Sequence, residues 1–263
     1  MLLAIDIGNS NVVIGCLNDK NETVKLFRMV TDLKKTEDEY AAGIETILRY
    51  NGFDGSCFHG AIICSVVPPL TEIFRSAVEQ ITGCRALVVG TGVKTGLNIM
   101  IENPASLGSD IVAASVAAMQ EFPLPVIVID MGTATTITVV DKGNQFKGGA
   151  IVPGVALSIN ALSSGTSLLQ KVPIEAPKKC INTGTTESMQ SGAVFGTAAL
   201  LDGMIDRFEA ELGSKASLVA TGGIAAKIVP HCTHQIVYDE NLLLRGLGMI
   251  YKKNQKQEKG STL

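Results

Sequence analysis

A segment near the start of the chain has a close counterpart near its middle. Residues 4–15 read AIDIGNSNVVIG and residues 128–139 read VIDMGTATTITV, so Asp6 aligns with Asp130 and Gly8 with Gly132. Each segment has the pattern of an apolar strand, a polar turn that contains glycine, and a returning strand. The repeat constrains the fold more than a single motif does, because it predicts two copies of one architecture.

Strand-like and helix-like patterns follow each hairpin in a similar order. In the first half we expect strands at 2–7, 12–17, 23–30, 61–67 and 86–89 and helices at 36–50 and 70–81. In the second half we expect strands at 125–130, 136–141, 146–152, 217–220 and 235–239 and helices at 155–163, 187–212 and 241–252. This order predicts an α/β protein with domains at 1–118 and 119–252. The polar segment 253–263 is predicted to be a disordered tail.

Composition excludes several classes of function. The 263 residues carry a net charge of −3, which is no electrostatic footprint for nucleic acid or an anionic membrane. No uncharged apolar stretch is long enough to span a bilayer, and the N-terminus lacks the basic region of a signal peptide. The six cysteines are scattered, without metal-ligand or CxxC spacing. We therefore expect a cytoplasmic protein with reduced thiols and neither nucleic acid nor membrane as a partner.

The first hairpin is a candidate phosphate-binding turn. A buried strand ends at Asp6 and is followed by Gly8, Asn9, Ser10 and Asn11. Glycine lets backbone N–H groups approach phosphate oxygens, and the small polar side chains add donors. A carboxylate beside them can hold Mg²⁺. The alternative is a plain hairpin turn, in which the same residue types are common.

The second hairpin favours the functional interpretation. Asp130 and Gly132 repeat the arrangement, and Thr133, Thr135 and Thr136 add hydroxyl groups that a structural turn does not need. Two acidic hairpins, one in each half, suit a phosphate clamp. The junction at 221–223, Thr-Gly-Gly after a strand, can approach a nucleotide or can be a simple turn. P-loop and Rossmann interpretations lack support, because no GxxxxGK[ST] or well-placed GxGxxG occurs.

An aspartate at a predicted helix start is a candidate catalytic base. Gly108, Ser109 and Asp110 precede an apolar helical stretch that runs to Glu121. The positive end of a helix dipole favours an ionised carboxylate in the first turn. Such a group can accept a hydroxyl proton or orient a hydroxyl in phosphoryl transfer. An acid that serves only the helix start is the alternative.

Five motifs in order resemble one known family over nearly the whole chain except the tail. They are DIGNSN (6–11), NPASLGSD (103–110), DMGTATT (130–136), GGAIVPG (148–154) and TTESMQSG (185–192). The ordered set is similar to type III pantothenate kinase, the Bvg accessory factor-like group. The DxGxT-type hairpins alone are typical of the wider actin-like and sugar-kinase superfamily.

The resemblance implies ATP-dependent phosphorylation of pantothenate to 4'-phosphopantothenate, the first step of coenzyme A biosynthesis. It implies a duplicated ribonuclease-H-like (actin-like ATPase) fold, two βββαβαβα halves with an inter-lobe cleft. It also implies a homodimer, with the substrate site bordering the subunit interface, and a requirement for Mg²⁺ and a monovalent cation, K⁺ or NH₄⁺.

The family's functional residues carry over to matching positions of this sequence. Asp110 would be the catalytic base, and Asp130 would bind the monovalent cation. The ATP-binding residues would be Asp6, Ile7, Gly8, Asn9, Ser10, Asn11, Val12, Val13 and Thr133. The pantothenate-binding residues would be Gly108, Ser109, Asp110, Ile111 and Thr185.

The chain departs from the family pattern on the acceptor side. Ile111 stands where the pattern Gly-x-Asp-Arg has arginine, and Met100 and Ile101 stand where basic and aromatic residues are common. Asn-Thr-Gly-Thr at 182–185 replaces the usual Gly-x-Asn-Thr. Losing an arginine that pairs with the carboxylate of pantothenate costs about 1.5–3 kcal/mol of binding free energy. Lys94 or Arg85 could supply the charge instead.

Two other functions remain open at this point. The altered acceptor side is compatible with a kinase of a different small alcohol. A non-catalytic nucleotide-binding or regulatory homologue is the other alternative, although Asp6, Asp130, Thr133 and Asp110 are all present. The three histidines, His59, His231 and His234, lie outside every motif and are interpreted as surface or loop residues.

Overall fold

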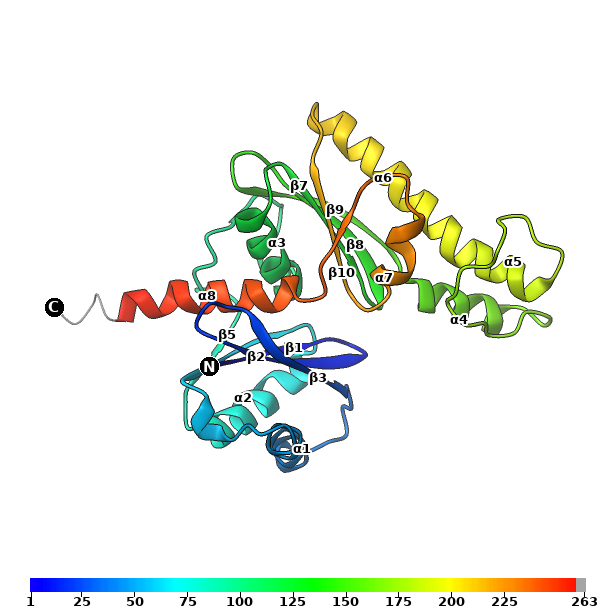
Figure 1. Cartoon of the computed structure of the whole chain (residues 1–263). Coiled ribbons are helices and arrows are strands. Elements are labelled where there is room, and N and C mark those ends of the chain that lie inside the picture. The colour runs from blue at the N-terminus through cyan, green and yellow to red at the C-terminus, as the bar shows by residue number, and fades with distance from the viewer. Residues whose placement is uncertain (259–263) are drawn as a thin grey trace. The chain divides into compact units, whose positions relative to one another are not determined.

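A computed structural model describes residues 1–258 of the chain (Figure 1). The chain forms two compact units. Unit 1 comprises Met1–Leu97, Glu102–Gln120 and Asn241–Leu263, the last described as far as residue 258. Unit 2 comprises Asn98–Ile101 and Glu121–Glu240. Among the described residues, no helix combines the length and the apolar character needed to cross a bilayer.

Unit 1 is built around a five-stranded sheet in the order β3-β2-β1-β4-β5. Strands β1 to β3 form an antiparallel meander, and β4 and β5 run parallel to β1. The strands are β1 (Leu2–Ile7), β2 (Asn11–Leu17), β3 (Thr23–Val30), β4 (Gly60–Ser65) and β5 (Ala86–Val88). The helices are α1 (Glu37–Tyr50), α2 (Pro68–Thr82), α3 (Ser109–Glu121) and α8 (Leu242–Glu258). The short 3₁₀ turns Gly55–Cys57 and Pro104–Ser106 also belong to this unit.

The two faces of this sheet are covered by different helices. Side chains at alternate positions, such as Ile5 and Ile63, form one apolar core with residues of α1 and α2. Helix α8 packs along β1, β2 and β4, and Leu244 lies directly against Gly15. A capping box between Thr36 and Glu39 starts α1. Asp6 falls on the face opposite the α1 and α2 core, because its neighbours Ile5 and Ile7 belong to that core.

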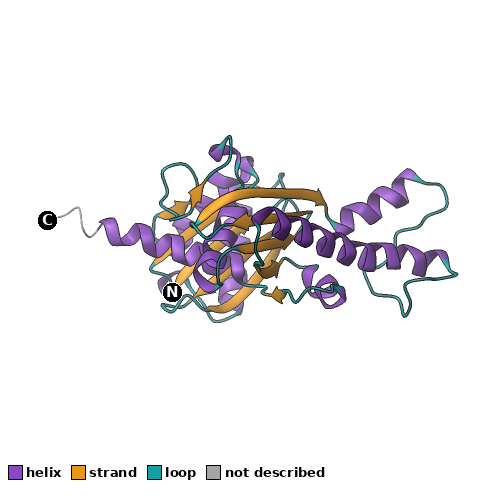
Figure 2. Ribbon diagram, turned by 90° about the horizontal axis from the view of Figure 1, so that it is seen from above, coloured by secondary structure: helices purple, strands orange, loops and turns teal. Residues whose placement is uncertain are grey.

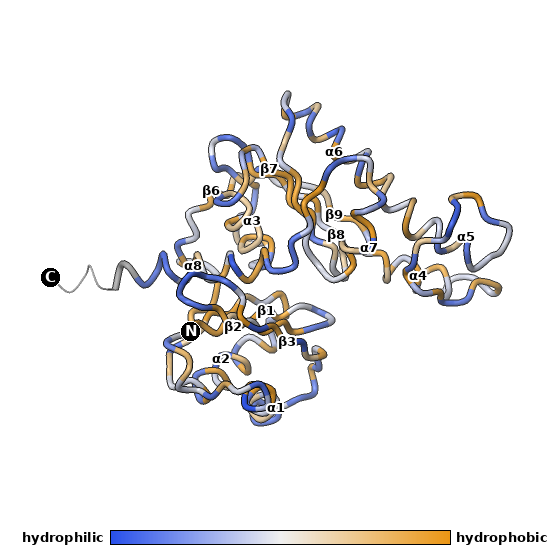
Figure 3. Tube along the Cα trace, in the orientation of Figure 1, coloured by the Kyte–Doolittle hydropathy of each residue, from blue (hydrophilic) through white to orange (hydrophobic). Residues whose placement is uncertain are grey.

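Unit 2 is built around a six-stranded sheet in the order β11-β10-β7-β8-β9-β6. The strands are β6 (Asn98–Ile99), β7 (Val126–Met131), β8 (Ala134–Val140), β9 (Gln145–Pro153), β10 (Ser217–Thr221) and β11 (Val237–Tyr238). The helices are α4 (Val155–Gly165), α5 (Thr185–Ser191), α6 (Thr197–Leu212) and α7 (Ala225–Ile228), and Val229–His231 is a 3₁₀ turn. Both views show α4, α5 and the start of α6 extending past the edge of this sheet (Figure 2). The strands carry the most hydrophobic stretches of each unit (Figure 3).

The duplicated fold predicted from the sequence is confirmed by the strand order. The order β9-β8-β7-β10-β11 in unit 2 repeats the order β3-β2-β1-β4-β5 in unit 1, with the same parallel and antiparallel pairings. The pairings β2–β3 and β8–β9 each contain a register shift near the end of the hairpin. In β1 and in β7, the fifth residue alone is not fully buried, and these residues are Asp6 and Asp130.

The two hairpins differ by one residue. Ile7 pairs with Val12, whereas Met131 pairs with Thr135, so the second turn is shorter by one residue. The alignment without a gap therefore holds for the first strand and the glycine but not beyond the turn. Val13 pairs with Asp6, and Thr136 pairs with Asp130, so Val13 and Thr136 occupy equivalent positions in the two hairpins.

The compact units differ from the domain ranges 1–118 and 119–252 expected from the sequence. The range Asn241–Leu263 belongs to unit 1, because α8 covers the sheet of that unit, and Asn98–Ile101 belongs to unit 2, because β6 pairs with β9. The predicted tail 253–263 is helical as far as Glu258, and its remainder lies outside the described residues. The single helix expected at 187–212 contains a π-helical turn at Gly192–Gly196.

Candidate functional site

The first hairpin presents three polar side chains at the end of β1. The Gly8 N–H donates to the Asn11 carbonyl oxygen at 3.0 Å and closes the turn, and Asn9, Ser10 and Asn11 are exposed. Thr31, the residue after β3, supports the turn. Its hydroxyl donates to the Gly8 carbonyl oxygen at 2.6 Å, and its N–H donates to the Ser10 carbonyl oxygen at 3.1 Å. These hydrogen bonds fix the backbone of the turn, and its side chains remain exposed to solvent. This arrangement suits the binding of a phosphate group.

A cysteine of the neighbouring strand contacts the carboxylate of this hairpin. The parallel register places Cys64 of β4 opposite Asp6 of β1. The Cys64 thiol donates to Asp6 Oδ1, with Sγ and Oδ1 3.1 Å apart. Cys64 is fully buried, and burial followed by the negative charges of Asp6 and Asp110 raises the pKa of its thiol well above the ordinary value. The thiol therefore stays protonated and serves as a donor.

The start of α3 is fastened to the same edge of the sheet. The Ser109 hydroxyl accepts the Ser65 N–H at 3.0 Å and donates to the Ser65 carbonyl oxygen at 3.1 Å. Ser65 is the last residue of β4 and pairs with Ile7 at the end of β1. The structure thus brings the predicted base Asp110 to the strand ends that carry Asp6.

The carboxyl group of Asp110 lies in a restricted space. A side chain at Gly108 would place its Cβ 2.3 Å from Asp110 Oδ1, so any other residue there would displace the carboxyl group from this position. The Ile111 N–H donates to Asp110 Oδ1 at 2.7 Å. Burial raises the pKa of Asp110, and the hydrogen bonds from backbone N–H groups oppose this shift in part. A carboxylate with a raised pKa, oriented by a backbone donor, is suited to accept a proton.

Neither of the two cations considered as substitutes for arginine lies at this edge. Arg85 precedes Ala86, which pairs with Ala61 at the opposite end of β4 from Ser65. The backbone of Lys94 is bonded to the side chain of Asn254, at 3.2 Å for the N–H and 3.1 Å for the carbonyl oxygen.

Helix α8 gives the position of Lys94 along β4. One turn before Asn254, Tyr251 packs against Gly60, the first residue of β4. The backbone of Lys94 therefore also lies near the far end of this strand. Neither Arg85 nor Lys94 is placed to supply, beside Ile111, the positive charge of the arginine in the family pattern.

The second hairpin is closed as tightly as the first. The Gly132 N–H donates to the Ala134 carbonyl oxygen at 3.0 Å, and Thr133 is exposed in the turn. Gly154, which follows β9, donates its N–H to the Thr133 carbonyl oxygen at 3.2 Å, and a Cβ there would lie 2.3 Å from that oxygen. The glycine of the GGAIVPG motif therefore permits the close approach that fixes the turn.

The carboxylate of Asp130 lies beside the end of β10. Thr221 pairs with Asp130, and the next residue, Gly222, has a φ of +94°. A Cβ at Gly222 would lie 2.6 Å from the Met131 carbonyl oxygen and 2.8 Å from Asp130 Oδ1. The Gly-Gly junction thus lets the backbone pass close to a carboxylate at a strand end. Oxygen ligands of this kind fit a hard cation such as K⁺ or Mg²⁺.

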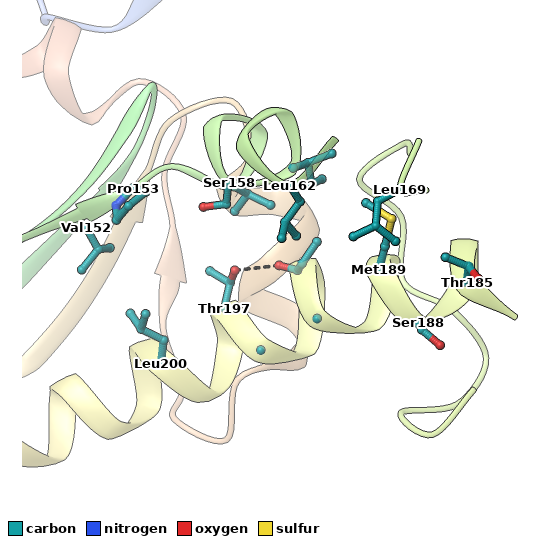
Figure 4. Close-up of a pocket in the computed structure, with 15 residues that line it drawn as sticks. Val152, Pro153, Ser158, Leu162, Leu169, Thr185, Ser188, Met189, Thr197 and Leu200 are labelled. Atoms are coloured by element: carbon teal, nitrogen blue, oxygen red, sulfur yellow. Dashed lines mark hydrogen bonds between the residues drawn. The ribbon is translucent and has the colours of Figure 1, made fainter. Parts of the chain in front are cut away.

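A pocket of about 610 Å³ opens in unit 2 between α4 and the helical stretch from α5 to α6 (Figure 4). At one end it is lined by Val152 and Pro153 of β9, and Pro153 pairs with Ala134 next to the second hairpin. Thr185, the first residue of α5, lines it as well. The Thr197 hydroxyl donates to the Ala193 carbonyl oxygen at 2.6 Å along its floor. Thr185, a predicted pantothenate-binding residue, therefore borders this cavity.

A charged cluster in unit 2 lies outside the predicted sites. His234 Nδ1 is 2.9 Å from Asp202 Oδ1, and its Nε2 is 3.1 Å from Asp206 Oδ1. Asp206, Glu209 and His234 lie close enough together to hold a metal ion, but Glu209 already forms an ion pair with Lys215 at 2.6 Å. These contacts fasten the segment after Val229–His231 to α6, and His234 is a partly buried loop residue, as the loop interpretation of the sequence allows.

Sequence patterns identified the acidic residues at the strand ends but not their neighbours. Cys64, Ser65 and Thr31 carry no motif, and their roles depend on which strands pair and in which register. A parallel pairing joins segments distant in sequence, so no local pattern reveals it. The apolar run at 61–67 predicted a buried strand, and only the structure places Cys64 opposite Asp6.

The sequence of this chain is similar to those of known proteins along most of its length. The model of the type III pantothenate kinase family matches residues 2–207. The type III pantothenate kinase of Brevibacillus brevis is 40% identical over 97% of this chain and its own full length, and that of Halalkalibacterium halodurans is 38% identical with the same coverage.

A solved structure shares the fold. The putative Baf family transcriptional activator of Campylobacter jejuni covers 97% of this chain and 99% of its own, with a TM-score of 0.58 and 22% identity. The match to the family model spans most of the chain, and the relatives are similar along nearly all of it. This chain therefore belongs to the type III pantothenate kinase family.

Proposed function

We infer that this chain transfers the γ-phosphate of ATP to pantothenate and forms 4'-phosphopantothenate, the first step of coenzyme A biosynthesis. Its membership of the type III pantothenate kinase family supports the reaction. The observation that carries the assignment within the structure is the position of Asp110, fastened through Ser109 to the strand ends that hold Asp6. A base and a phosphate-binding carboxylate in one unit are what phosphoryl transfer to an alcohol requires.

The ATP side of the proposal rests on the two hairpins. Asp6 and the turn residues Gly8 to Asn11 bind the phosphates, and Thr133 contributes a hydroxyl from the second hairpin. Asp6 holds Mg²⁺, which when bound neutralises charge on the phosphoryl group. Asp130 binds the monovalent cation, K⁺ or NH₄⁺, and the partial exposure of its carboxylate at a strand end supports this role. Positioning and charge neutralisation supply most of the rate enhancement in such reactions.

The acceptor side of the proposal rests on Asp110 and its neighbours. Residues 108–111 and Thr185 bind pantothenate, and Asp110 accepts or orients the proton of its hydroxyl. The raised pKa of Asp110 keeps its basicity above that of an exposed aspartate. The Ser109 hydroxyl, already bonded twice to Ser65, contributes to this site by fixing the start of α3.

A second candidate function is phosphorylation of a different small alcohol. Ile111 offers no charge to a carboxylate, and Arg85 and Lys94 belong to the opposite end of β4. Met100, in place of a basic or aromatic residue, is half exposed beside β6. An acceptor without a carboxylate would fit these substitutions better than pantothenate does.

The experiment that separates the two is a coupled assay of ADP release with ATP, Mg²⁺ and K⁺. We expect turnover that depends on pantothenate. Turnover of another alcohol at a much higher kcat/KM, with pantothenate nearly inactive, would favour the second function. Nucleotide binding with no turnover of any acceptor would contradict both and favour the non-catalytic alternative.

We extend the proposal to a homodimer and to a cytoplasmic location. Exposed apolar side chains gather on α4, α6 and the segment between α4 and α5, namely Leu157, Leu162, Leu168, Ile181 and Leu200. Such a group on one part of a surface is typical of a subunit interface. The six cysteines are all unpaired thiols, which is usual in the reducing cytoplasm where ATP is abundant.

A further inference from the structure

We propose that Cys64 is a positioning residue for the reaction, and that its thiol orients the Asp6 carboxylate for Mg²⁺–ATP. The inference rests on the proposed function, because it needs Asp6 in that role. The observation that motivates it is the contact of 3.1 Å between Cys64 Sγ and Asp6 Oδ1 at the edge of the sheet that also carries Asp110.

The backbone makes this contact a built feature of the fold. Cys64 and Asp6 are direct partners in the parallel pairing of β1 and β4, so their side chains extend from the same face of the sheet. Cys64 is fully buried and cannot leave this position, whereas Asp6 is partly exposed. A hydrogen bond from a fixed donor to one carboxylate oxygen limits rotation of the carboxylate, which favours one geometry for an octahedral Mg²⁺.

The thiol is suited to be a permanent donor. In the contact with Asp6 Oδ1 the thiol is the donor, because a carboxylate oxygen can only accept, and the full burial of Cys64 favours the neutral thiol. A thiolate there would instead repel Asp6. The same burial makes Cys64 inert as a nucleophile, because the thiol and not the thiolate is present. Its contribution is therefore orientation of Asp6 without chemistry of its own.

Another buried cysteine of the same sheet provides a matched control. Cys16 of β2 is also fully buried, and burial raises the pKa of its thiol to about 12. Its side chain belongs to the apolar core with α1 and α2, on the face opposite Asp6. Replacing Cys16 tests the loss of a buried thiol from this sheet, whereas replacing Cys64 tests in addition the loss of a donor to Asp6.

The experiment measures the affinity of the full-length protein for ATP by calorimetry, with Mg²⁺ and with EDTA, for Cys64→Val, Cys64→Ser and Cys16→Val. We expect Mg²⁺ to strengthen ATP binding by the wild type, and we expect Cys64→Val to weaken MgATP binding about tenfold while its affinity in EDTA changes little. Cys64→Ser keeps a donor and should retain affinity within about twofold of the wild type. Cys16→Val should keep the wild-type effect of Mg²⁺. If Cys64→Val does not fold, Cys64→Ala takes its place.

The outcomes separate this inference from the function on which it rests. Asp6→Asn, measured in the same way, should lose the effect of Mg²⁺. If Asp6→Asn loses that effect and Cys64→Val keeps it, the inference is overturned and the role of Asp6 stands. Equal losses in Cys64→Val and Cys64→Ser would also overturn it, since packing and not the donor would then be responsible. If Asp6→Asn binds MgATP as the wild type does, the role of Asp6 and the inference are both wrong.

Discussion

At the scale of residues, the site depends on carboxylates whose environments differ. Asp6 is partly exposed at the end of β1 and accepts a hydrogen bond from Cys64. Asp110 lies in the first turn of α3, where burial raises its pKa and Gly108 leaves space for its carboxyl group. Two carboxylates in different environments can take different roles, one with the metal and phosphates and one with a proton.

Replacement of the proposed base should separate chemistry from binding. We expect Asp110→Asn to lower kcat by about 10²–10⁴-fold, because the shape is kept and the proton acceptor is lost. ATP affinity should change less than about twofold by calorimetry. Asp38→Asn is a matched control, since Asp38 is an exposed acid in the first turn of α1. Turnover of Asp110→Asn at the rate of the wild type would rule out the assignment.

The raised pKa of Asp110 predicts the acid side of the pH profile. Burial disfavours the charged form, so the carboxylate takes up a proton at a higher pH than an ordinary aspartate does. The protonated form cannot accept a proton, so kcat should fall as the pH drops through this raised pKa. The check is kcat against pH at saturating substrates, with samples returned to neutral pH to exclude unfolding. A profile that stays flat down to the ordinary range of aspartate would contradict it.

Candidate functional residues could be predicted only where they belong to a pattern of residues adjacent in sequence. The hairpins and the helix start identified Asp6, Asp130 and Asp110, because strand, turn and cap patterns involve residues adjacent in sequence. Cys64 and Thr31 were missed because their contacts are made across strands. The substitutes proposed for arginine, Lys94 and Arg85, were suggested by charge alone, and the register of β4 and β5 assigns Arg85 to the wrong end of the sheet.

At the scale of elements, glycine positions define how the strand ends approach one another. Gly154 brings the end of β9 against the second hairpin, and Gly222 brings the end of β10 against Asp130. The sequence predicted the strands that meet here but not the closeness of the approach. The π-helical turn at Gly192–Gly196 was missed for a similar reason: helical periodicity runs across it, and the extra residue per turn has no local sequence pattern.

Substitution of Gly222 tests whether this close approach requires glycine, and the neighbouring Gly223 provides the control. We expect Gly222→Ala to lower the free energy of unfolding by about 1–3 kcal/mol, because the positive φ and the contact with the Met131 carbonyl oxygen both oppose a Cβ. Gly223→Ala meets no atom within 4 Å and should cost less than about 0.5 kcal/mol. Urea denaturation measures both. Equal stability of the two variants would show that the junction relaxes easily.

The Gly222→Ala variant also tests the proposed binding of K⁺ by Asp130. If Asp130 binds K⁺, the Cβ of Gly222→Ala, which would lie 2.8 Å from Asp130 Oδ1, should displace the carboxylate and raise the K⁺ concentration that gives half-maximal activity. Gly223→Ala should leave that concentration unchanged. A K⁺ dependence that is the same in both variants would argue against a cation beside Gly222.

At the scale of the molecule, one architecture is used twice with different additions. Both sheets share the order of five strands, and unit 2 adds β6 and the extended α4 to α6 region. The duplication was readable from the sequence because both hairpins retain the acidic strand end and the glycine. The assignment of α8 to unit 1 was not readable, because periodicity predicts a helix without indicating which sheet it covers.

The proposed dimer is tested at its exposed apolar face. We expect Leu162→Glu to convert the dimer to a monomer at micromolar concentration, because a charge in an apolar interface is left without a partner. Leu162 is 47% exposed on α4 and lines the pocket that Thr185 borders. Light scattering coupled to size-exclusion chromatography measures the mass. Tyr50→Glu, at a residue 90% exposed in unit 1, is the control, and equal masses for the two variants would contradict an interface on α4.

The path of the chain through unit 1 links folding to protein synthesis. Helix α8 supplies the fully or almost fully buried residues Leu242, Leu244, Leu247 and Ile250, and it covers a sheet whose strands are made first. While the ribosome synthesises unit 2, one face of that sheet remains open to water. The nascent chain therefore carries an apolar surface of the kind that chaperones bind until α8 emerges. A message truncated before α8 would yield a polypeptide that quality-control proteases recognise, even though every residue of the two candidate phosphate-binding hairpins has been translated.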